Sequence, residues 1–136
     1  MNDKNKDAFE QELDPFIQAV LGKKALDVVV LDVRKLTSVA DAFIVCSGRS
    51  NRQVTALGEF IKQDLKKQGK QPLNVEGLKE GHWVLMDYGY VIVHIFFEQV
   101  RSFYDLEGLW ADARRIRIEQ AVPPNDKTPD AEVYIE

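Results

Sequence analysis

The segment from Gly81 to Phe96 constrains the fold most, because two alternating runs of side chains flank a short turn. Strands with one buried face alternate in this way, and two such runs around a tight turn are typical of a β-hairpin. The dipeptide Tyr88-Gly89 lies between the runs and is the predicted loop. That loop sets the facing pairs of the two strands as Asp87–Tyr90, Leu85–Ile92 and Trp83–His94.

The predicted hairpin has two unlike faces. One face is wholly apolar and is expected in the core beneath the helices; it consists of Val84, Met86, Val91, Val93 and Ile95. The other is aromatic with polar groups and consists of Trp83, Leu85, Asp87, Tyr90, Ile92, His94 and Phe96. Aromatic residues with polar tips are common in protein interfaces, so the second face is predicted to bind a protein. A register shift of one residue would exchange the faces.

Helical and strand patterns precede the hairpin. Apolar residues at helical spacing predict a helix over 9–24, with Asp14 as its cap and Pro15 in its first turn; residues before Asp14 form a separate turn in this interpretation. The nearly continuous apolar runs 26–33 and 42–46 are typical of strands covered on both faces.

A second helix is expected after the strand at 42–46. Ser50 and Gln53 have the spacing of a capping box, and Gly69 is expected to end the helix. Its buried stripe is predicted to be Val54, Leu57, Ile61 and Leu65. A short edge strand over 72–75 and a helix over 98–107 complete the pattern. The fold class is therefore α/β (α+β), a mixed β-sheet with packed helices.

The length of 136 residues fits one domain. We expect a flexible N-terminus over 1–8, a single α/β domain over 9–116, and an acidic, proline-containing and disordered tail over 117–136. No run approaches the ~20 apolar residues that span a bilayer. The N-terminus lacks the pattern of a signal or transit peptide, and Cys46 is the only cysteine, so a cytoplasmic location is expected.

The formal net charge of −4 disfavours binding to bare nucleic acid, which generally needs a basic patch. Lys62, Lys66 and Lys67 lie on one predicted helix, and Arg114, Arg115 and Arg117 lie near the end. Acids and apolar residues are mixed with both groups, and the lysines are interpreted as a solvated helix face. A protein partner, itself basic, is the expectation.

Signals for catalysis are weak. Ser47 or Ser50 could be combined with His82 or His94, but no nucleophile-elbow pattern is present. Cys46 lies in an apolar strand and is interpreted as a small buried hydrophobe. The two histidines offer no spacing for a metal site, so neither metal nor cofactor is expected.

Two polar features leave alternatives open. His94 is interpreted as a hydrogen-bonded structural residue, while Asp87 is either a polar group of the turn or an interface residue. The turn Ser47-Gly48-Arg49-Ser50 precedes a helix, where backbone donors favour anions. It lacks the glycines and lysine of a phosphate-binding loop, so it supports a nucleotide-binding enzyme only weakly.

Several collinear blocks resemble the ribosomal silencing factor S family, also called Iojap-like, over roughly Phe16 to Ala113. The blocks are Lys24–Val33, Ala40–Ser50, Gly81–Gly89, Val91–Phe96 and Arg101–Trp110. The resemblance implies a fold similar to nucleotidyltransferases without transferase activity. In agreement, the strand positions that would carry a transferase's catalytic carboxylates hold apolar residues and histidine.

The resemblance also implies a partner and a mechanism. Family members bind the universal large-subunit ribosomal protein fourteen, block association with the small subunit and thereby repress translation. Carried over to this sequence, the partner-binding residues would be Trp83, Asp87, Tyr88, Arg101, Tyr104, Leu106 and Trp110. Packing of the last helix on the sheet is the alternative for Trp110 and is favoured for Phe103.

Two other functions stay open at this point. Organellar relatives act in large-subunit assembly, which would use the same surface, and the Ser47–Ser50 turn leaves the nucleotide-binding enzyme as the less favoured hypothesis. An exposed sheet edge near Pro72 could support a homodimer of the free protein.

Overall fold

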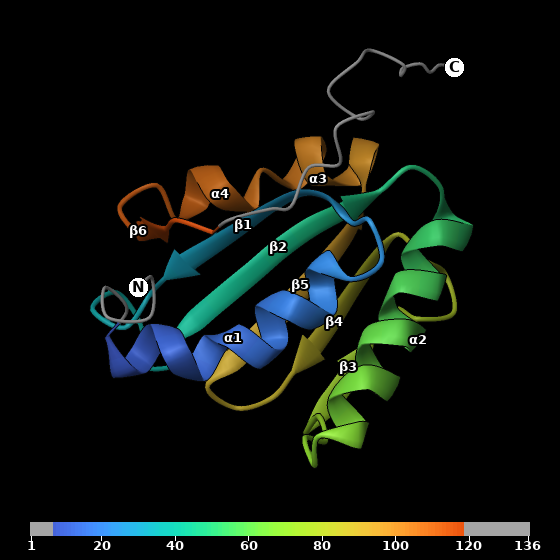
Figure 1. The fold of residues 1–136 in the computed structure, drawn as a ribbon. Helices are drawn as coiled ribbons and strands as arrows, with labels where there is room; N and C mark the ends of the chain where they lie inside the picture. The colour runs from blue at the N-terminus through green and yellow to red at the C-terminus, as the bar shows by residue number, and fades with distance from the viewer. Residues whose placement is uncertain (1–6, 119–136) are drawn as a thin grey trace, which may run out of the picture.

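The computed structural model describes residues 7–118 and contains one six-stranded sheet with helices on both faces (Figure 1). The strand order is β3-β4-β5-β2-β1-β6. In chain order the elements are α1 (Ala8–Leu21), β1 (Leu26–Asp32), β2 (Ala42–Gly48), α2 (Asn51–Lys67), β3 (Asn74–Glu76), β4 (Trp83–Asp87), β5 (Val91–Phe97), α3 (Glu98–Tyr104), α4 (Leu106–Leu109) and β6 (Arg114–Ile116).

The sheet is mixed. Strand β2 is parallel to β5, and the other neighbouring strands are antiparallel. A parallel pair needs a long crossover, which α2, β3 and β4 supply between β2 and β5. The predicted α/β (α+β) class is confirmed, and β3 lies at the sheet edge as expected.

Two hydrophobic clusters fill the two sides of the sheet. The first joins α1 and α2 to one sheet face and contains the whole apolar hairpin face predicted from sequence: Val84, Met86, Val91, Val93 and Ile95. The second lies on the opposite face, where Leu106 of α4 packs with Phe43, Ile92 and Phe96. Helices therefore cover both faces, as the apolar strands predicted.

Helix α2 agrees with its sequence pattern. Ser50 Oγ accepts a hydrogen bond from the backbone N–H of Gln53 at 3.1 Å, and Gln53 Oε1 accepts one from the N–H of Arg49 at 2.6 Å. The predicted stripe of Val54, Leu57, Ile61 and Leu65 is buried. After the helix, Gly69 adopts a φ of +79° and donates its N–H to the carbonyl of Lys66, which ends the helix as predicted.

The predicted start of the first helix is wrong. Helix α1 begins at Ala8, and its cap is Asp7, whose carboxylate accepts the N–H of Glu10 at 2.8 Å. Pro15 lies inside the helix rather than in its first turn. The apolar stripe explains this difference, because Leu13, on the N-terminal side of Pro15, is fully buried in the core. Burial of this turn outweighs the backbone donor that proline lacks.

The predicted facing pairs of the hairpin are also wrong. Trp83 pairs with Phe96, Leu85 with His94, and Asp87 with Ile92. The connection is longer than the Tyr88-Gly89 dipeptide, because Asp87 Oδ1 accepts the Gly89 N–H and the Tyr88 N–H is donated to the Val91 carbonyl. The register thereby moves by two positions, which leaves the side chains of β4 and β5 on their predicted faces. The placement of Tyr90 on the aromatic face is wrong, because Tyr90 lies in the turn and its ring is 5.7 Å from Phe16 of α1, on the other side of the sheet.

The region after the hairpin differs from a single helix over 98–107. The helical conformation is interrupted at Asp105, where φ is 48° and ψ is 56°, and this break separates α3 from α4. The short strand β6 follows and pairs with β1, which the sequence did not predict. The flexible segment predicted over 1–8 and the tail predicted over 117–136 fall mostly outside the described residues.

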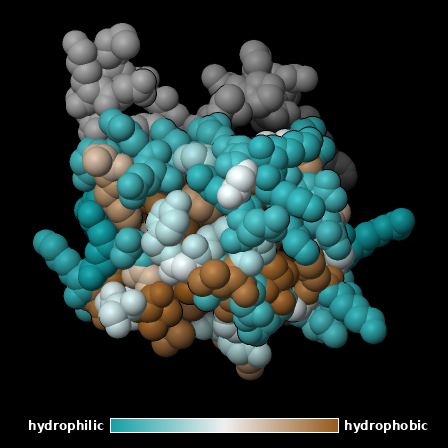
Figure 2. All heavy atoms as spheres, turned by 90° about the horizontal axis from the view of Figure 1, so that it is seen from below, coloured by the Kyte–Doolittle hydropathy of each residue, from teal (hydrophilic) through white to brown (hydrophobic). Residues whose placement is uncertain are grey.

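The end of the molecule that faces down in Figure 1 carries a band of hydrophobic residues bordered by hydrophilic ones (Figure 2). Leu73 precedes edge strand β3 and is an exposed large hydrophobic residue. Its backbone N–H bonds the carbonyl of Asp87 at 2.7 Å, so it lies at the end of the hairpin. Strand β3 forms an edge of the sheet, and Leu73 beside it is exposed. This edge could pair with a second copy, so the homodimer stays a prediction.

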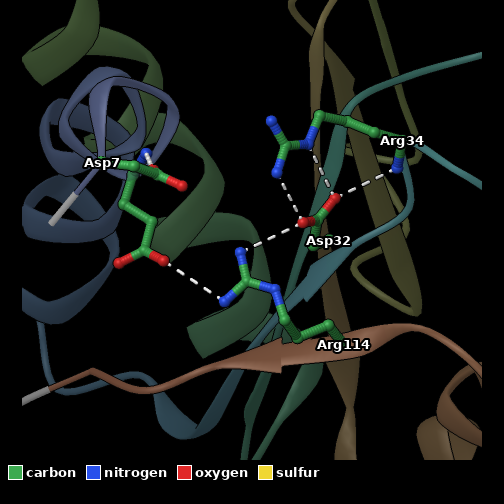
Figure 3. Close-up of polar contacts among 5 residues, drawn as sticks. Asp7, Asp32, Arg34 and Arg114 are labelled. Atoms are coloured by element: carbon green, nitrogen blue, oxygen red, sulfur yellow. Dashed lines mark hydrogen bonds and ion pairs between the residues drawn. The ribbon is translucent and has the colours of Figure 1, made fainter.

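A polar network ties β6 to the rest of the fold (Figure 3). Arg114 bonds Glu10 of α1 at 3.2 Å and Asp32 of β1 at 3.1 Å. Arg34 also pairs with Asp32, at 2.9 Å, and its guanidinium carbon lies 3.6 Å from the Phe9 ring centroid. The hydrogen bond from Arg34 is the main cause that lowers the pKa of Asp32 from 3.8 to about 2.

This network predicts an acid-sensitive contribution to stability. A carboxyl whose pKa is lowered by folding stabilises the fold above its unfolded pKa, here 3.8, and loses that contribution as the pH falls toward about 2. Asp32→Asn should therefore flatten the fall in unfolding free energy between pH 4 and 2. Because the pair is partly solvated, the loss at neutral pH should stay near about 1 kcal/mol. Urea unfolding at several pH values measures both; exposed Asp112→Asn, as control, should keep the wild-type slope.

A second prediction concerns Gly81, which joins the start of β4 to α2. Its φ is +72°, and a Cβ atom there would lie 2.3 Å from the backbone carbonyl oxygen of Asn51. Gly81→Ala should lower the unfolding free energy by about 3 kcal/mol, since backbone strain and a steric clash add. Gly69→Ala is the control, with a φ of +79° but no atom within 4 Å of the added Cβ. It should lose about 1 kcal/mol. Equal losses in urea unfolding would contradict the clash.

Candidate partner-binding surface

The second face of the hairpin is only partly open. Ile92, His94 and Phe96 of β5 are buried, because α3 and α4 pack over this part of the sheet. The expectation that these three side chains form a binding surface is therefore wrong. On the neighbouring strand β4, Trp83 and Leu85 are only half-buried. The open part of the face thus lies at β4, beside α3.

Three aromatic residues continue this open part onto α3. The Trp83 ring lies 5.0 Å from the Tyr104 ring, and Tyr104 lies 5.2 Å from Phe103 in an edge-to-face contact. Tyr104 is 49% exposed and Phe103 is 81% exposed. We call Trp83, Phe103 and Tyr104 the aromatic surface. Exposed large aromatic residues in contact with one another are a common mark of protein-binding sites.

Leu106 and Trp110 hold α4 against the sheet. Leu106 is buried in the second cluster, and the Trp110 ring lies 5.1 Å from Phe43 in an edge-to-face contact. Packing is therefore the main role of both residues in the fold. The packing interpretation of Phe103 is wrong, because that side chain is among the most exposed hydrophobic ones described. Leu109 of α4 is similarly exposed.

Tyr88 does not join the aromatic surface. Its side chain is 8% exposed and lies in the first cluster, on the opposite sheet face, with its ring 5.2 Å from Phe16. Burial raises the pKa of Tyr88 to about 12, and its hydroxyl has no hydrogen-bond partner among the described residues. The expectation that Tyr88 and Trp83 contact one partner together is corrected, because the sheet separates them.

The guanidinium group of Arg101 is bound by other residues of the protein. Its Nη2 lies 2.6 Å from Glu107 Oε2, and its Nη1 donates to Ser47 Oγ at 2.8 Å. The Arg101 side chain is only 11% exposed, and Ser47 on β2 is buried. The guanidinium is thus shared between α4 and the sheet. Its charge is not presented to a partner as the sequence suggested.

His94 accepts a hydrogen bond from the side chain of Trp83. The indole N–H of Trp83 donates to His94 Nδ1 at 3.1 Å, which confirms that His94 is a hydrogen-bonded structural residue. This bond requires the proton of the neutral imidazole to lie on Nε2, which has no partner among the described residues. Burial lowers the pKa of His94 from 6.5 to about 4. The imidazole is therefore neutral at physiological pH.

Asp87 has a role in the turn. Its Oδ1 accepts the backbone N–H of Gly89 at 2.8 Å, and the residue is half-buried at the end of β4. The structure therefore supports the turn interpretation directly. Asp87 lies on the same side of β4 as Trp83 and Leu85, so it borders the open face as well.

Apart from exposed His82, the groups considered for catalysis are engaged or inaccessible. Cys46 is fully buried, and burial raises the pKa of its thiol to about 12. Ser50 Oγ caps α2, and the Arg49 N–H is bound by Gln53, so the turn before α2 satisfies these groups itself. Within residues 7–118, no group of three or more histidine, cysteine or acidic side chains could hold a metal ion, and no helix could cross a membrane.

Comparison with known proteins identifies the family. Residues 6–134 match the family described as "Ribosomal silencing factor during starvation". The chain belongs to this family. Ribosomal silencing factor RsfS of Halalkalibacterium halodurans is 38% identical over 106 residues, which are 78% of this chain and 91% of that protein. The Bacillus subtilis protein of the same name is 44% identical over 91 residues, 67% of this chain and 77% of that protein.

A solved structure agrees with this assignment. A crystal structure of a Chromobacterium violaceum protein has a TM-score of 0.72 and 39% sequence identity, and the match covers 83% of this chain and 92% of that one. The resemblance seen in the sequence is thus confirmed at the level of the family. The family consists of silencing factors rather than enzymes.

Two parts of the surface were missed by sequence reasoning. The exposure of Phe103 depends on the chain break at Asp105, which ends α3 one residue after Tyr104. The Arg101 contact to Ser47 joins residues 54 positions apart, so no local pattern announces it. Asp105, with Gly108 three residues later, was the sequence pattern that could have predicted the break. Aspartate tolerates the left-handed backbone region better than most residues.

The burial of His94 predicts that the unfolding free energy also depends on pH, in a higher pH range than the effect of Asp32. A histidine whose pKa is lowered by folding leaves the fold fully stable above its unfolded pKa of 6.5, and stability falls as the pH drops toward about 4. The loss should be as large as about 3 kcal/mol in that window. His94→Gln, which keeps an acceptor for Trp83, should remove the loss in chemical unfolding at pH 7, 5.5 and 4.5. Exposed His82→Gln should retain it, and the opposite result would assign the titration to His82.

Proposed function

We propose that this protein binds the large ribosomal subunit through large-subunit protein fourteen and prevents the small subunit from joining. Its family is that of ribosomal silencing factors, and the aromatic surface is the observation that carries the proposal. The mechanism is steric occupancy, so it requires a rigid surface and no reactive group. The cytoplasm, where subunits join in bacteria, is the proposed location.

The proposed contact residues are narrower than the set expected from the sequence. Trp83, Tyr104 and Phe103 supply the centre, because they are in ring contact and open to solvent on one side. Asp87 borders this centre on β4. Leu106, Trp110 and Arg101 act behind the surface by holding α3 and α4, and Tyr88 lies on the other side of the sheet.

Charge favours a basic partner. The whole chain has a net charge of −4, and Asp87 of β4 and Glu76 of β3 both lie on the open side of the sheet, around Leu85. Exposed Asp105 lies next to Tyr104. An acidic rim around an aromatic centre would be repelled by ribosomal RNA and attracted by a basic ribosomal protein. Complementarity of this kind raises the association rate and sets orientation more than it raises affinity.

The decisive measurement is binding to isolated large-subunit protein fourteen by titration calorimetry. Tyr104→Ala and Trp83→Ala should each weaken binding by about 2 kcal/mol or more, as expected for aromatic hot spots. Trp83→Phe keeps an aromatic ring against Phe96 and should preserve the fold. Weaker binding by this variant would therefore not be caused by misfolding. Val39→Ala, in the β1–β2 loop, removes exposed apolar surface elsewhere and should bind like wild type. Wild-type binding by both hot-spot variants would move the interface away from the aromatic surface.

Sedimentation of purified subunits tests the consequence. Wild-type protein should keep large and small subunits apart at a magnesium concentration that otherwise joins them, and Tyr104→Ala should not. An assembly factor would instead cosediment with precursor particles and leave mature subunits free to join. A thermal shift with magnesium and a nucleoside triphosphate would favour the nucleotide-binding hypothesis. A homodimer formed through the β3 edge would appear as a doubled mass of the free protein.

A further inference from the structure

The side chain of Arg101 joins three separate elements. It lies on α3, its Nε and Nη2 both donate to the Glu107 carboxylate of α4, and its Nη1 donates to Ser47 of β2. The shortest of these contacts, Nη2 to Glu107 Oε2, is 2.6 Å. The planar guanidinium presents its donors in a fixed fork, so contacts in two directions define an orientation as well as a distance. We call Arg101, Glu107 and Ser47 the clamp.

Apolar contacts between the two helices and the sheet come mainly from Val100 of α3, Leu106 of α4 and Trp110 at the end of α4. Helix α3 has no buried residue, and Leu106 is the only buried residue of α4. Between them, Asp105 adopts a left-handed conformation, with its N–H donated to the Arg101 carbonyl and its carboxylate accepting the N–H of Gly108. Helices this short are not stable alone, so their angle depends on such tertiary contacts. The clamp is the polar contact that spans this break and anchors it to the sheet.

The aromatic surface depends on that angle. Phe103 and Tyr104 are the last two residues of α3, between Arg101 and the break at Asp105. Tyr104 contacts Trp83 of β4, whereas Phe103 touches Tyr104 and is otherwise largely in solvent. Movement of the α3 end would separate Tyr104 from Trp83. In the orientation seen in the structure, Tyr104 contacts both Trp83 and Phe103.

We infer that Arg101 is a positioning residue: through the clamp it fixes the α3–α4 break so that Phe103, Tyr104 and Trp83 form one surface before the partner arrives. The inference rests on the proposed function, because it concerns the same surface. Arg101 itself touches no partner. Glu107 and Ser47 share its role, and the surface is preformed rather than assembled during binding.

Positioning and direct contact have different kinetic signatures. Loss of a direct contact chiefly raises the dissociation rate. Loss of a positioning residue leaves the contacts of the bound state intact but lowers the fraction of free molecules that are competent to bind. The apparent association rate falls by that fraction. The two roles can therefore be separated in one protein by comparing the two rate constants.

The experiment uses surface plasmon resonance with immobilised large-subunit protein fourteen. Arg101→Gln and Glu107→Gln should each slow association by about tenfold and change dissociation by less than about twofold. The double variant should resemble either single variant, since both break one unit. Arg101→Lys keeps the charge without the fork and should recover only part of the rate. Tyr104→Ala should instead speed dissociation, as expected for a residue that touches the partner.

The matched control is Glu98→Gln. Glu98 lines the same polar groove of about 460 Å³ beside Arg101, so this change removes an equal charge without breaking the clamp. It should leave both rate constants at the wild-type values. Hydrogen exchange supplies the second readout: Arg101→Gln should speed exchange in residues 98–109 while β2 and β5 stay protected.

Each other result has a distinct meaning. Faster dissociation of Arg101→Gln with unchanged association would overturn the inference by making Arg101 a contact residue. Unchanged rates in both clamp variants would overturn it too, as would loss of protection throughout the sheet. Absence of binding by the wild-type protein would overturn the proposed function itself, an outcome visible before any variant is compared.

Discussion

The fold depends on the complete burial of strand β2. Every residue of this strand is buried, and alternate side chains enter opposite clusters: Ala42, Ile44 and Cys46 on one face, Phe43 and Val45 on the other. A strand of this kind must be paired on both edges and covered on both faces. Its parallel partner β5 forces the long crossover through α2, β3 and β4. The chain after β5 must then cover the remaining face.

Within the described residues, the chain after β5 covers only part of this face. Helices α3 and α4 contain 7 and 4 residues and pack over the second cluster, where they bury Phe96 and leave Trp83 half-open. Within residues 7–118, β4 therefore stays partly uncovered because these are the two short helices that follow β5. A partner bound there would extend the layer that α3 and α4 begin. Exposed Phe103 extends this apolar area beyond the sheet.

Sequence patterns predicted the elements better than their ends. Local spacing identified strands β1 to β5, the α2 cap and the two faces of the hairpin strands, whereas β6 and the position of Tyr90 were missed. It failed at the start of α1, where burial of Leu13 in the core carries the helix past Pro15. It also failed in the hairpin turn, where a local hydrogen bond from the Gly89 N–H to Asp87 accompanies a longer connection than the two-residue loop that was predicted. The expected binding residues divided in the same way. The family resemblance suggested Trp83, Tyr104, Tyr88 and Arg101 alike, and only the tertiary contacts separate the first two from buried Tyr88 and paired Arg101.

The proposed mechanism of steric occupancy needs a shape that persists, and several polar residues of this chain hold such a shape. Ser47 and Glu107 bind Arg101, His94 binds the Trp83 indole, and the Asp105 carboxylate closes the turn that starts α4. An enzyme would keep such groups accessible and their pKa values near the working pH. Here burial carries the pKa of His94 to about 4, away from that range, while its hydrogen bond orients an aromatic ring. The same residue types that first suggested chemistry therefore hold the elements of the proposed binding surface in place.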